Sequence, residues 1–210
     1  MPGKPPLNQF HLSPCRAKEG EFRDYSQAEN DRITYLFRRI ILDLGFVTLA
    51  AAVNRSAWNE LVVGDIKDEL GQPEGLCFFK CIELVINTIR FRKPGQQVFI
   101  FFDQGTKTQL DGWARLYRGQ SQQFPEIAGI SFAPVPKVVA LQGADMIATE
   151  TYQYALEWLK AGENAVANAH FREYLKRELS TGLVFDRAQI AEMVTRVHET
   201  LAHPSGTTQS

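Results

Sequence analysis

The sequence lacks a surplus of positive charge. Its 23 lysines and arginines are balanced by 24 aspartates and glutamates, so the formal net charge is −1. A global positive field that attracts nucleic acid is therefore absent, and any such binding has to rest on a local patch. The basic residues that could form one are Arg38, Arg39, Arg90, Arg92 and Lys93. The simpler alternative for each of them is the solvated end of a helix.

Cysteines and long apolar runs are also scarce. Three cysteines are too few for a disulfide framework and are typical of a reducing cytoplasm. No run approaches 18 consecutive apolar residues, so we expect no transmembrane helix. The opening residues, MPGKPPLNQF, contain no apolar segment of the signal-peptide type. We therefore expect a cytoplasmic protein with no membrane partner.

The common catalytic motifs are missing. There is no Gly-rich phosphate loop, no Gly-x-Ser-x-Gly and no His-Glu-x-x-His. The four histidines stand in unrelated contexts, so the sequence does not support a serine or cysteine nucleophile with a neighbouring histidine. Cys77 and Cys81 fall in the most apolar segment, where free cysteine behaves as a small hydrophobic residue. A zinc site is therefore not favoured.

The chain does contain alternating helical and strand patterns. With 210 residues, 44% of them hydrophobic, it suits one domain over 8–201 with flexible ends at 1–7 and 203–210. A short helical turn and a loop are expected over 56–71. Longer helices are expected at 26–44, 73–91, 108–123, 142–160, 165–179 and 186–201, and strands at 46–53, 96–103 and 129–135. This alternation predicts an α/β fold whose strands are buried on both faces.

The first long helix has the clearest local signals. The sequence SQAE from Ser26 to Glu29 is a capping box, in which the two side chains bind backbone donors of the first turn. Gly45 is a natural stop. Between them, apolar residues recur at helical spacing and predict one buried stripe, formed by Ile33, Leu36, Phe37, Ile40, Ile41 and Leu44.

Two aspartates occur in or next to apolar segments that are expected to form the core. Asp103 follows the apolar run 98–102, and the carboxyl end of a buried strand is where open α/β sheets place ligands. The alternative is that Asp103 caps the following turn. Asp145 is predicted in the first turn of its helix, where the macrodipole favours an anion. Its small neighbours also leave room for a ligand beside its carboxylate.

Carboxylates from different elements are what Mg²⁺ or Mn²⁺ requires, because one or two of them plus substrate phosphates suffice. Two such ions can stabilise the attacking and leaving oxygens of a phosphodiester. Asp103 and Asp145 are the predicted ligands. Glu150 lies five residues after Asp145, roughly 140° round the helix, so we do not expect it to share a metal with Asp145. We expect Glu150 to pair with a basic group on another element, with a supporting role behind a metal ligand as the alternative.

The segment LQGADMIATETY, Leu141 to Tyr152, resembles the bacterial proteins that carry domain of unknown function 3800. Their core ends in a Leu-Gln-x-Ala-Asp motif that opens a helix, often followed by Glu-Thr-Tyr. Phe10 and His11 match the family's Phe-His-Met entry, with leucine in place of methionine. The strand that ends in Asp103 matches its mid-chain strand. The resemblance covers about 10–159.

This resemblance implies a ribonuclease H-like fold, a mixed sheet flanked by helices, here with a helical C-terminal part. Sites of this superfamily bind divalent metal with acids from a first strand, a central strand and a late helix. Asp103 and Asp145 match the second and third acids, with His11, Gln142 and Glu150 as accessory candidates. The family's leading strand, with Asp-Glu-Ser, and its hairpin have no counterpart ahead of Phe10. We therefore expect an N-terminally truncated sheet and an incomplete acidic triad.

The leading functional expectation is a metal-dependent nuclease-like protein that hydrolyses phosphodiesters with bound Mg²⁺ or Mn²⁺. A mobile element or a defence system is a setting that would suit it. One alternative is a catalytically inactive interaction module, with a sheet edge exposed for a homo-oligomer. The other is a nucleic-acid binder without catalysis, whose affinity would depend on salt and not on metal.

Overall fold

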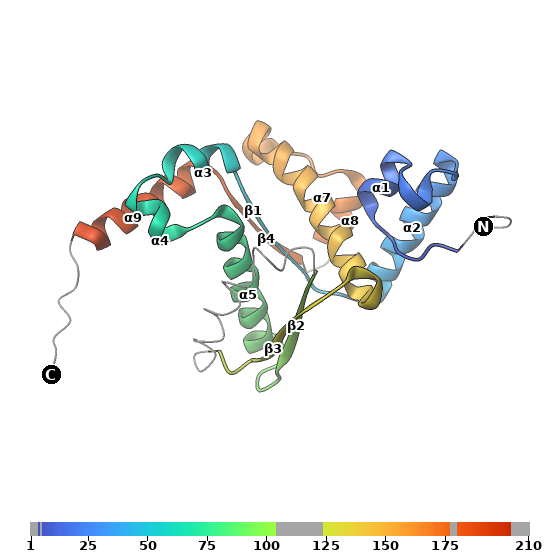
Figure 1. Ribbon diagram of the computed structural model, residues 1–210, viewed down its shortest axis with the longest axis horizontal. Helices are drawn as coiled ribbons and strands as arrows, with labels where there is room; N and C mark the ends of the chain where they lie inside the picture. The colour runs from blue at the N-terminus through green and yellow to red at the C-terminus, as the bar shows by residue number, and fades with distance from the viewer. Residues whose placement is uncertain (1–3, 5, 104–123, 177–179, 203–210) are drawn as a thin grey trace.

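The computed structural model describes residues 4, 6–103, 124–176 and 180–202, and over these the chain is an α/β protein (Figure 1). Its strands are β1 (Thr48–Val53), β2 (Val98–Asp103), β3 (Ile127–Ala133) and β4 (Ser180–Phe185). Its α-helices are α1 (Leu12–Ala17), α2 (Gln27–Asp43), α3 (Arg55–Leu61), α4 (Asp65–Leu70), α5 (Pro73–Arg92), α7 (Val139–Ala161), α8 (Ala169–Leu175) and α9 (Arg187–Ala202). Short 3-10 turns occur at η1 (Gly20–Phe22), η4 (Val135–Lys137) and η5 (Gly162–Asn164).

The longer helices follow the predicted pattern. Helices α2, α5, α7 and α9 lie where they were expected, although α7 begins at Val139, three residues earlier than predicted. Only Ala169–Leu175 of the helix expected at 165–179 is helical among the described residues. Residues 56–71 form two helices, α3 and α4, rather than a turn and a loop. The helix expected at 108–123 lies outside the described residues.

The strands differ more from expectation. In place of one mixed sheet, the described strands form two separate pairs, β1–β4 and β2–β3, and both pairs are parallel. Strand β4 was not predicted. It contains Gly182, which lies opposite Ala50 in the register. The strands are also less buried than expected, because β1 is half-buried along its length and Phe99 and Phe101 of β2 are exposed.

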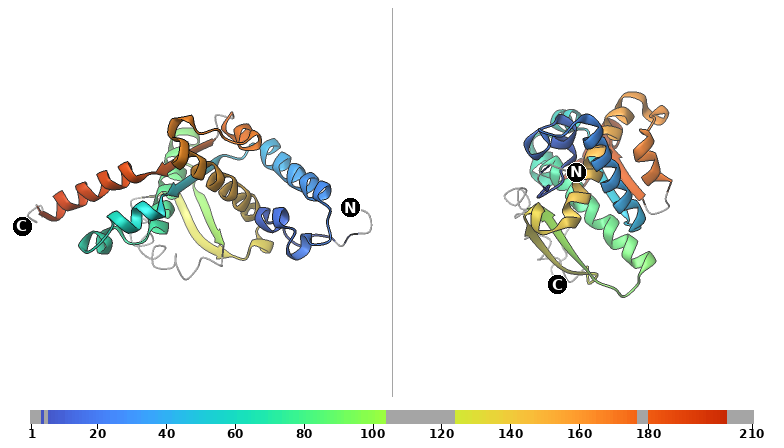
Figure 2. Two further views of the ribbon diagram at one scale, coloured as in Figure 1. Left: turned by 90° about the horizontal axis from the view of Figure 1, so that it is seen from above. Right: turned by 90° about the vertical axis from the view of Figure 1, so that its right-hand side faces the viewer.

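Three apolar clusters hold the described residues together. The first joins α1, α2, α7 and α8, with Leu12 and Met146 at its centre. The second lies around Trp58 where α3 and α4 meet α9. In the third, α5 covers one face of β2–β3. Figures 1 and 2 show α1 and α2 of the first cluster near the N-terminal end of the molecule, and α3, α4 and α9 of the second cluster toward the opposite end. Helices long and apolar enough to cross a membrane do not occur in the described part of the chain.

The residues at the start of the predicted domain contact the first cluster and η1. Leu7, placed in the flexible end 1–7, packs against the first cluster. The backbone N–H of Asn8 donates to the Glu21 carboxylate at 2.8 Å. Leu7 and Asn8 therefore both contact the N-terminal helical part of the chain. The predicted flexible end 203–210 lies outside the described residues.

Helix α2 buries only part of the apolar stripe that was predicted. Ile33, Phe37 and Ile41 pack on the first cluster, as expected. Leu36, Ile40 and Leu44 remain exposed. Polar residues take their place in the interior, namely Asn30, Thr34 and Arg38. The single apolar stripe is therefore divided between the core and the surface.

The capping box of α2 is confirmed. The Ser26 hydroxyl accepts a bond from the Glu29 N–H, and the Glu29 carboxylate accepts one from the Ser26 N–H at 2.7 Å. We expect Ser26→Ala to lower the free energy of unfolding by about 1 kcal/mol, because an orphan donor of the first turn loses its acceptor. Urea unfolding measures this change. The control Ser13→Ala, at an exposed position of α1, should change stability by no more than about 0.5 kcal/mol. Equal effects of the two changes would contradict the capping role.

Candidate functional site

Asp145 lies on α7, but not where the sequence suggested. Because α7 begins at Val139, Asp145 is in the second turn of the helix rather than the first. The macrodipole acts mainly within the first turn, so it does not explain this carboxylate. The charge of Asp145 has to be accounted for by its side-chain neighbours.

Those neighbours come from the start of α1. The Oδ2 atom of Asp145 lies 3.3 Å from Nδ1 of His11, which is the residue that precedes α1, and 3.4 Å from the backbone N of Leu12. The Asp145 side chain is 35% exposed and the His11 ring is 28% exposed. The other carboxylate oxygen, Oδ1, makes no hydrogen bond to the described residues. Oδ2 of Asp145 is therefore bound by the start of α1, whereas Oδ1 has no hydrogen-bond partner among the described residues.

Gln142 fixes the backbone that carries His11. Its Oε1 atom accepts a hydrogen bond from the Phe10 N–H at 2.8 Å, and Gln142 is buried. Gln142, which was expected as an accessory residue, thus lies one turn away from Asp145 and links the backbone just ahead of His11 to α7.

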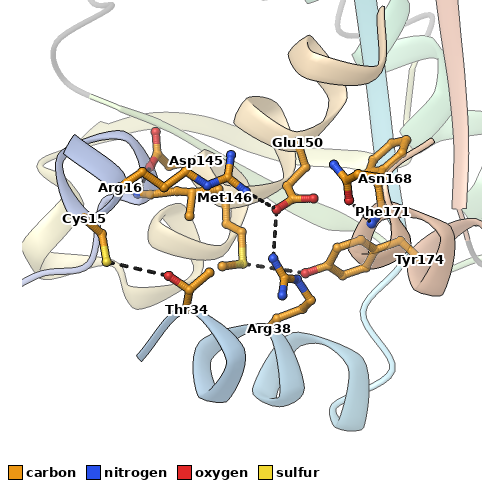
Figure 3. A network of polar contacts seen from close by, with 11 residues as sticks. Cys15, Arg16, Thr34, Arg38, Asp145, Met146, Glu150, Asn168, Phe171 and Tyr174 are labelled. Carbon is orange, nitrogen blue, oxygen red and sulfur yellow. Dashed lines mark hydrogen bonds and ion pairs between the residues drawn. The ribbon is translucent and has the colours of Figure 1, made fainter. Parts of the chain in front are cut away.

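Glu150 forms the second polar link between α7 and the N-terminal helices. Its carboxylate is fully buried, and Oε1 accepts hydrogen bonds from Nη2 of Arg16 and Nη2 of Arg38, each at 2.9 Å. Figure 3 shows both guanidinium groups directed at this carboxylate. The predicted pairing of Glu150 with a basic group on another element is confirmed. The sequence did not identify either arginine.

Arg38 was a candidate for a basic surface patch, with a solvated helix end as the alternative, and its burial contradicts both. Its side chain is buried against Glu150, because one face of α2 carries Asn30, Thr34 and Arg38 at a spacing of four residues into the core. That regular polar spacing is the signal in the sequence that could have indicated a buried polar face. Two other members of the expected patch also have acidic partners: Arg39 pairs with Asp43, and Arg90 pairs with Glu126.

The Arg16–Glu150–Arg38 cluster carries one net positive charge, since two guanidinium groups share one carboxylate. Glu150 Oε2 and Arg38 Nε are buried and have no hydrogen-bond partner within the described part of the chain. Each such atom costs about 1–3 kcal/mol of desolvation. Arg16 is the exposed member, with 43% of its side chain accessible. The excess charge therefore reaches the surface on α1, the helix that His11 precedes.

Asp103 ends β2 and lies opposite Ala133 of β3 in the register. From Ala133 the chain runs through η4 directly into α7, and α7 packs against β2. Asp103 is therefore at the end of the β2–β3 pair from which α7 starts. Asp145, in contrast, makes its hydrogen bonds to His11 and Leu12 at the start of α1. Within the described ranges, no three His, Cys, Asp or Glu side chains are grouped so that they could hold one metal ion.

Of the residues expected at a metal site, the structure brings His11 and Asp145 into contact. Asp145 offers Oδ1 while His11 and the Leu12 N–H hold Oδ2, which is how metal-binding carboxylates are commonly oriented. Asp103 is the second candidate donor. Mg²⁺ and Mn²⁺ accept one or two carboxylates when water and phosphate supply the other oxygens. Glu150 is not available, because it is buried between two arginines.

Comparisons of the chain with models of protein families, with curated protein sequences and with solved structures gave no match in any of the three.

Removing the Glu150 carboxylate should be strongly destabilising. Glu150→Ala leaves the buried Arg38 guanidinium without its counter-charge, and we expect a loss of about 3–5 kcal/mol in the free energy of unfolding. Urea unfolding followed by circular dichroism measures it. The matched control is Glu83→Ala, which breaks an exposed pair with Lys80 and should cost no more than about 0.5 kcal/mol. A loss below about 1 kcal/mol for Glu150→Ala would contradict the bridging role.

Tyr174 provides a pH-dependent test of the same core. Burial raises the pKa of Tyr174 to about 12 from its usual value of 10. In the unfolded chain this tyrosine ionises near pH 10 while the folded protein keeps it neutral, so its contribution to stability is lost as pH rises from 10 to 12. Tyr174→Phe should therefore lose less stability than the wild type over this interval, by an amount on the order of 2 kcal/mol. Parallel losses in the two proteins would show that Tyr174 titrates normally.

Proposed function

We propose that this chain is a metal-dependent, nuclease-like protein of ribonuclease H-like fold that hydrolyses phosphodiesters, with Asp145 and Asp103 as ligands of Mg²⁺ or Mn²⁺. The observation that supports this proposal is the state of Asp145. It is a half-exposed carboxylate with one oxygen held by His11 and Leu12 and the other open. Because the side chain is partly exposed, Oδ1 can be reached by water or by a metal ion.

Each neighbouring residue has a distinct part in this proposal. Gln142 fixes the Phe10 backbone, and the Arg16–Glu150 link fixes α1, so together they place His11 beside Asp145. Nδ1 of His11 faces Asp145, which leaves Nε2 as the ring atom available to a phosphate oxygen or a water molecule. Arg16 supplies positive charge at the surface of α1. When bound, the divalent ion stabilises negative charge on the reacting phosphate oxygens.

An inactive interaction module is the second candidate, and the exposed strands favour it. Both strand pairs have open edges in the described part of the chain. Phe99 and Phe101 of β2 are exposed with their rings 5.4 Å apart. Exposed apolar side chains on an open sheet suit pairing with another chain, including a second copy. In this case metal would have no effect on the protein's properties.

Asp145→Asn should abolish Mn²⁺-dependent cleavage of nucleic acid, because the amide oxygen is a neutral and weaker ligand. Single-stranded and double-stranded DNA and RNA are incubated with the full chain, with and without Mn²⁺, and the products are separated on gels. His11→Gln should reduce cleavage about 10- to 100-fold, the usual range for residues that orient a ligand.

Asp68→Asn is the matched control, since Asp68 is an exposed aspartate in the first turn of α4. It should retain the wild-type rate. Cleavage by Asp145→Asn at the wild-type rate would show that the site is elsewhere. A wild-type protein that cleaves none of the substrates and binds no Mn²⁺ in calorimetry would favour the interaction module.

A further inference from the structure

We propose that the chain binds a small phenol, a single aromatic ring that carries a hydroxyl group, in a cavity between α7, α8 and the β1–β4 pair. We call this space the β1–β4 cavity, and its volume is about 120 Å³. An apolar cavity of about 150 Å³ in another protein stays dry and binds benzene. A single ring is therefore the size of ligand that the β1–β4 cavity can hold. This proposal does not depend on nuclease-like activity.

The β1–β4 cavity exists because two small residues meet in register. Ala50 of β1 lies opposite Gly182 of β4, and both line the cavity. Partners in adjacent strands point to the same face of a sheet, so neither strand sends a bulky group into the cavity at this level. The backbone does not require glycine at position 182, because its φ lies outside the left-handed region and an added Cβ would meet only the Ala50 carbonyl oxygen, at an ordinary 3.5 Å. The glycine therefore leaves space rather than permitting a special turn.

Three aromatic side chains form one wall of the cavity, namely Tyr154 of α7 and Phe171 and Tyr174 of α8. The Phe171 ring centroid lies 5.3 Å from that of Tyr154 and 6.3 Å from that of Tyr174. Figure 3 shows the Phe171 and Tyr174 rings next to each other on α8. The Asn168 side chain accepts a hydrogen bond from the Phe171 N–H at 2.8 Å, and the Tyr174 hydroxyl donates to the sulfur of Met146. Because aromatic rings pair favourably in offset or edge-to-face geometry, this fixed wall favours an aromatic ligand over a saturated one.

The hydroxyl of Thr151 is the polar group that selects a phenol. Thr151 lines the cavity from α7 and is 8% exposed. Its Oγ1 atom is buried and has no hydrogen-bond partner within the described part of the chain. A threonine hydroxyl can donate one hydrogen bond and accept others, and leaving it buried and unpaired costs stability. A ligand hydroxyl, which both donates and accepts, would satisfy it, whereas a hydrocarbon ring of the same shape would not.

The cavity is open on one side. Leu175 and Leu183 line it and are 45% and 37% exposed, whereas Ile147 and Thr151 in the same lining are buried. The exposed leucines therefore mark the opening, and the buried residues of α7 mark the inner end. A small ring can enter between α8 and β4 and reach Thr151 with its hydroxyl group.

Fluorine NMR of the full chain tests the proposal with para-fluorophenol and para-fluorotoluene, two rings of nearly the same shape that differ in the hydroxyl. Broadening of each ligand signal as protein is added gives its dissociation constant. We expect para-fluorophenol to bind in the millimolar range or more tightly. Para-fluorotoluene should bind about 2- to 10-fold more weakly, which corresponds to one hydrogen bond. Equal affinities of the two probes, or no saturable binding of para-fluorophenol, overturn the proposal.

Thr151→Val removes the hydroxyl and keeps the shape of the side chain. It should weaken binding of para-fluorophenol about 2- to 10-fold and leave that of para-fluorotoluene unchanged, because only the phenol loses a hydrogen bond. The preference between the two probes should therefore disappear. A preference for para-fluorophenol that persists in Thr151→Val overturns the assignment of the ligand.

Gly182→Val fills the cavity and should abolish binding of both probes. Valine suits a strand, and its Cβ fits at this position. The matched control is Ser131→Val, which places the same side chain on β3 of the other strand pair and should leave both dissociation constants unchanged. Ala50→Leu is a second blocking variant, and it decides the matter if Gly182→Val does not fold by circular dichroism. Binding that persists in a folded blocking variant overturns the proposal.

Discussion

The buried carboxylate of Glu150 is the interaction on which the N-terminal half of the structure depends. It binds Arg16 of α1 and Arg38 of α2 through one oxygen, so two consecutive helices meet the distant helix α7 at a single atom. A buried charge of this kind is tolerated only in a narrow geometry, because its desolvation must be offset by well-placed partners. By fixing α1 against α7, the Glu150 cluster also fixes His11 beside Asp145. The candidate site is thus a consequence of a structural ion cluster one turn further along α7.

Local features of this arrangement could be predicted from the sequence. The Ser26 cap, the separate roles of Asp145 and Glu150, and the basic partner for Glu150 all follow from helix period and side-chain chemistry. The identity of that partner could not be predicted, since Arg38 and Glu150 are 112 residues apart. The apolar residues of α2 cover more than one face, and periodicity alone does not show which edge turns inward. Burial of Asn30, Thr34 and Arg38 is decided by α1 and α7, not by α2 itself.

The strands also show that long-range partners cannot be predicted from local sequence patterns. Strands β2 and β3 have strong apolar runs and were expected, but β4 contains Gly182 and follows directly on a helical pattern, so it gave no clear signal. Its partner β1 is distant in the chain, and parallel pairing of such segments is specified by tertiary contacts. For the candidate site, the sequence placed Asp145 on the correct helix. Only the structure showed that this helix begins at Val139. The helix macrodipole therefore does not account for the carboxylate of Asp145.

Paramagnetic broadening by Mn²⁺ is the most direct measurement of whether Asp145 binds a divalent ion. Histidine-labelled protein gives ring signals for only four residues, His11, His170, His198 and His203, and His198 lies on α9 at the other end of the molecule. On substoichiometric addition of Mn²⁺, we expect the His11 signals and the Leu12 amide to broaden first, with His198 unchanged. In Asp145→Asn this selectivity should disappear. Equal broadening of His11 and His198, or broadening of His11 that persists in Asp145→Asn, would contradict a metal site at Asp145.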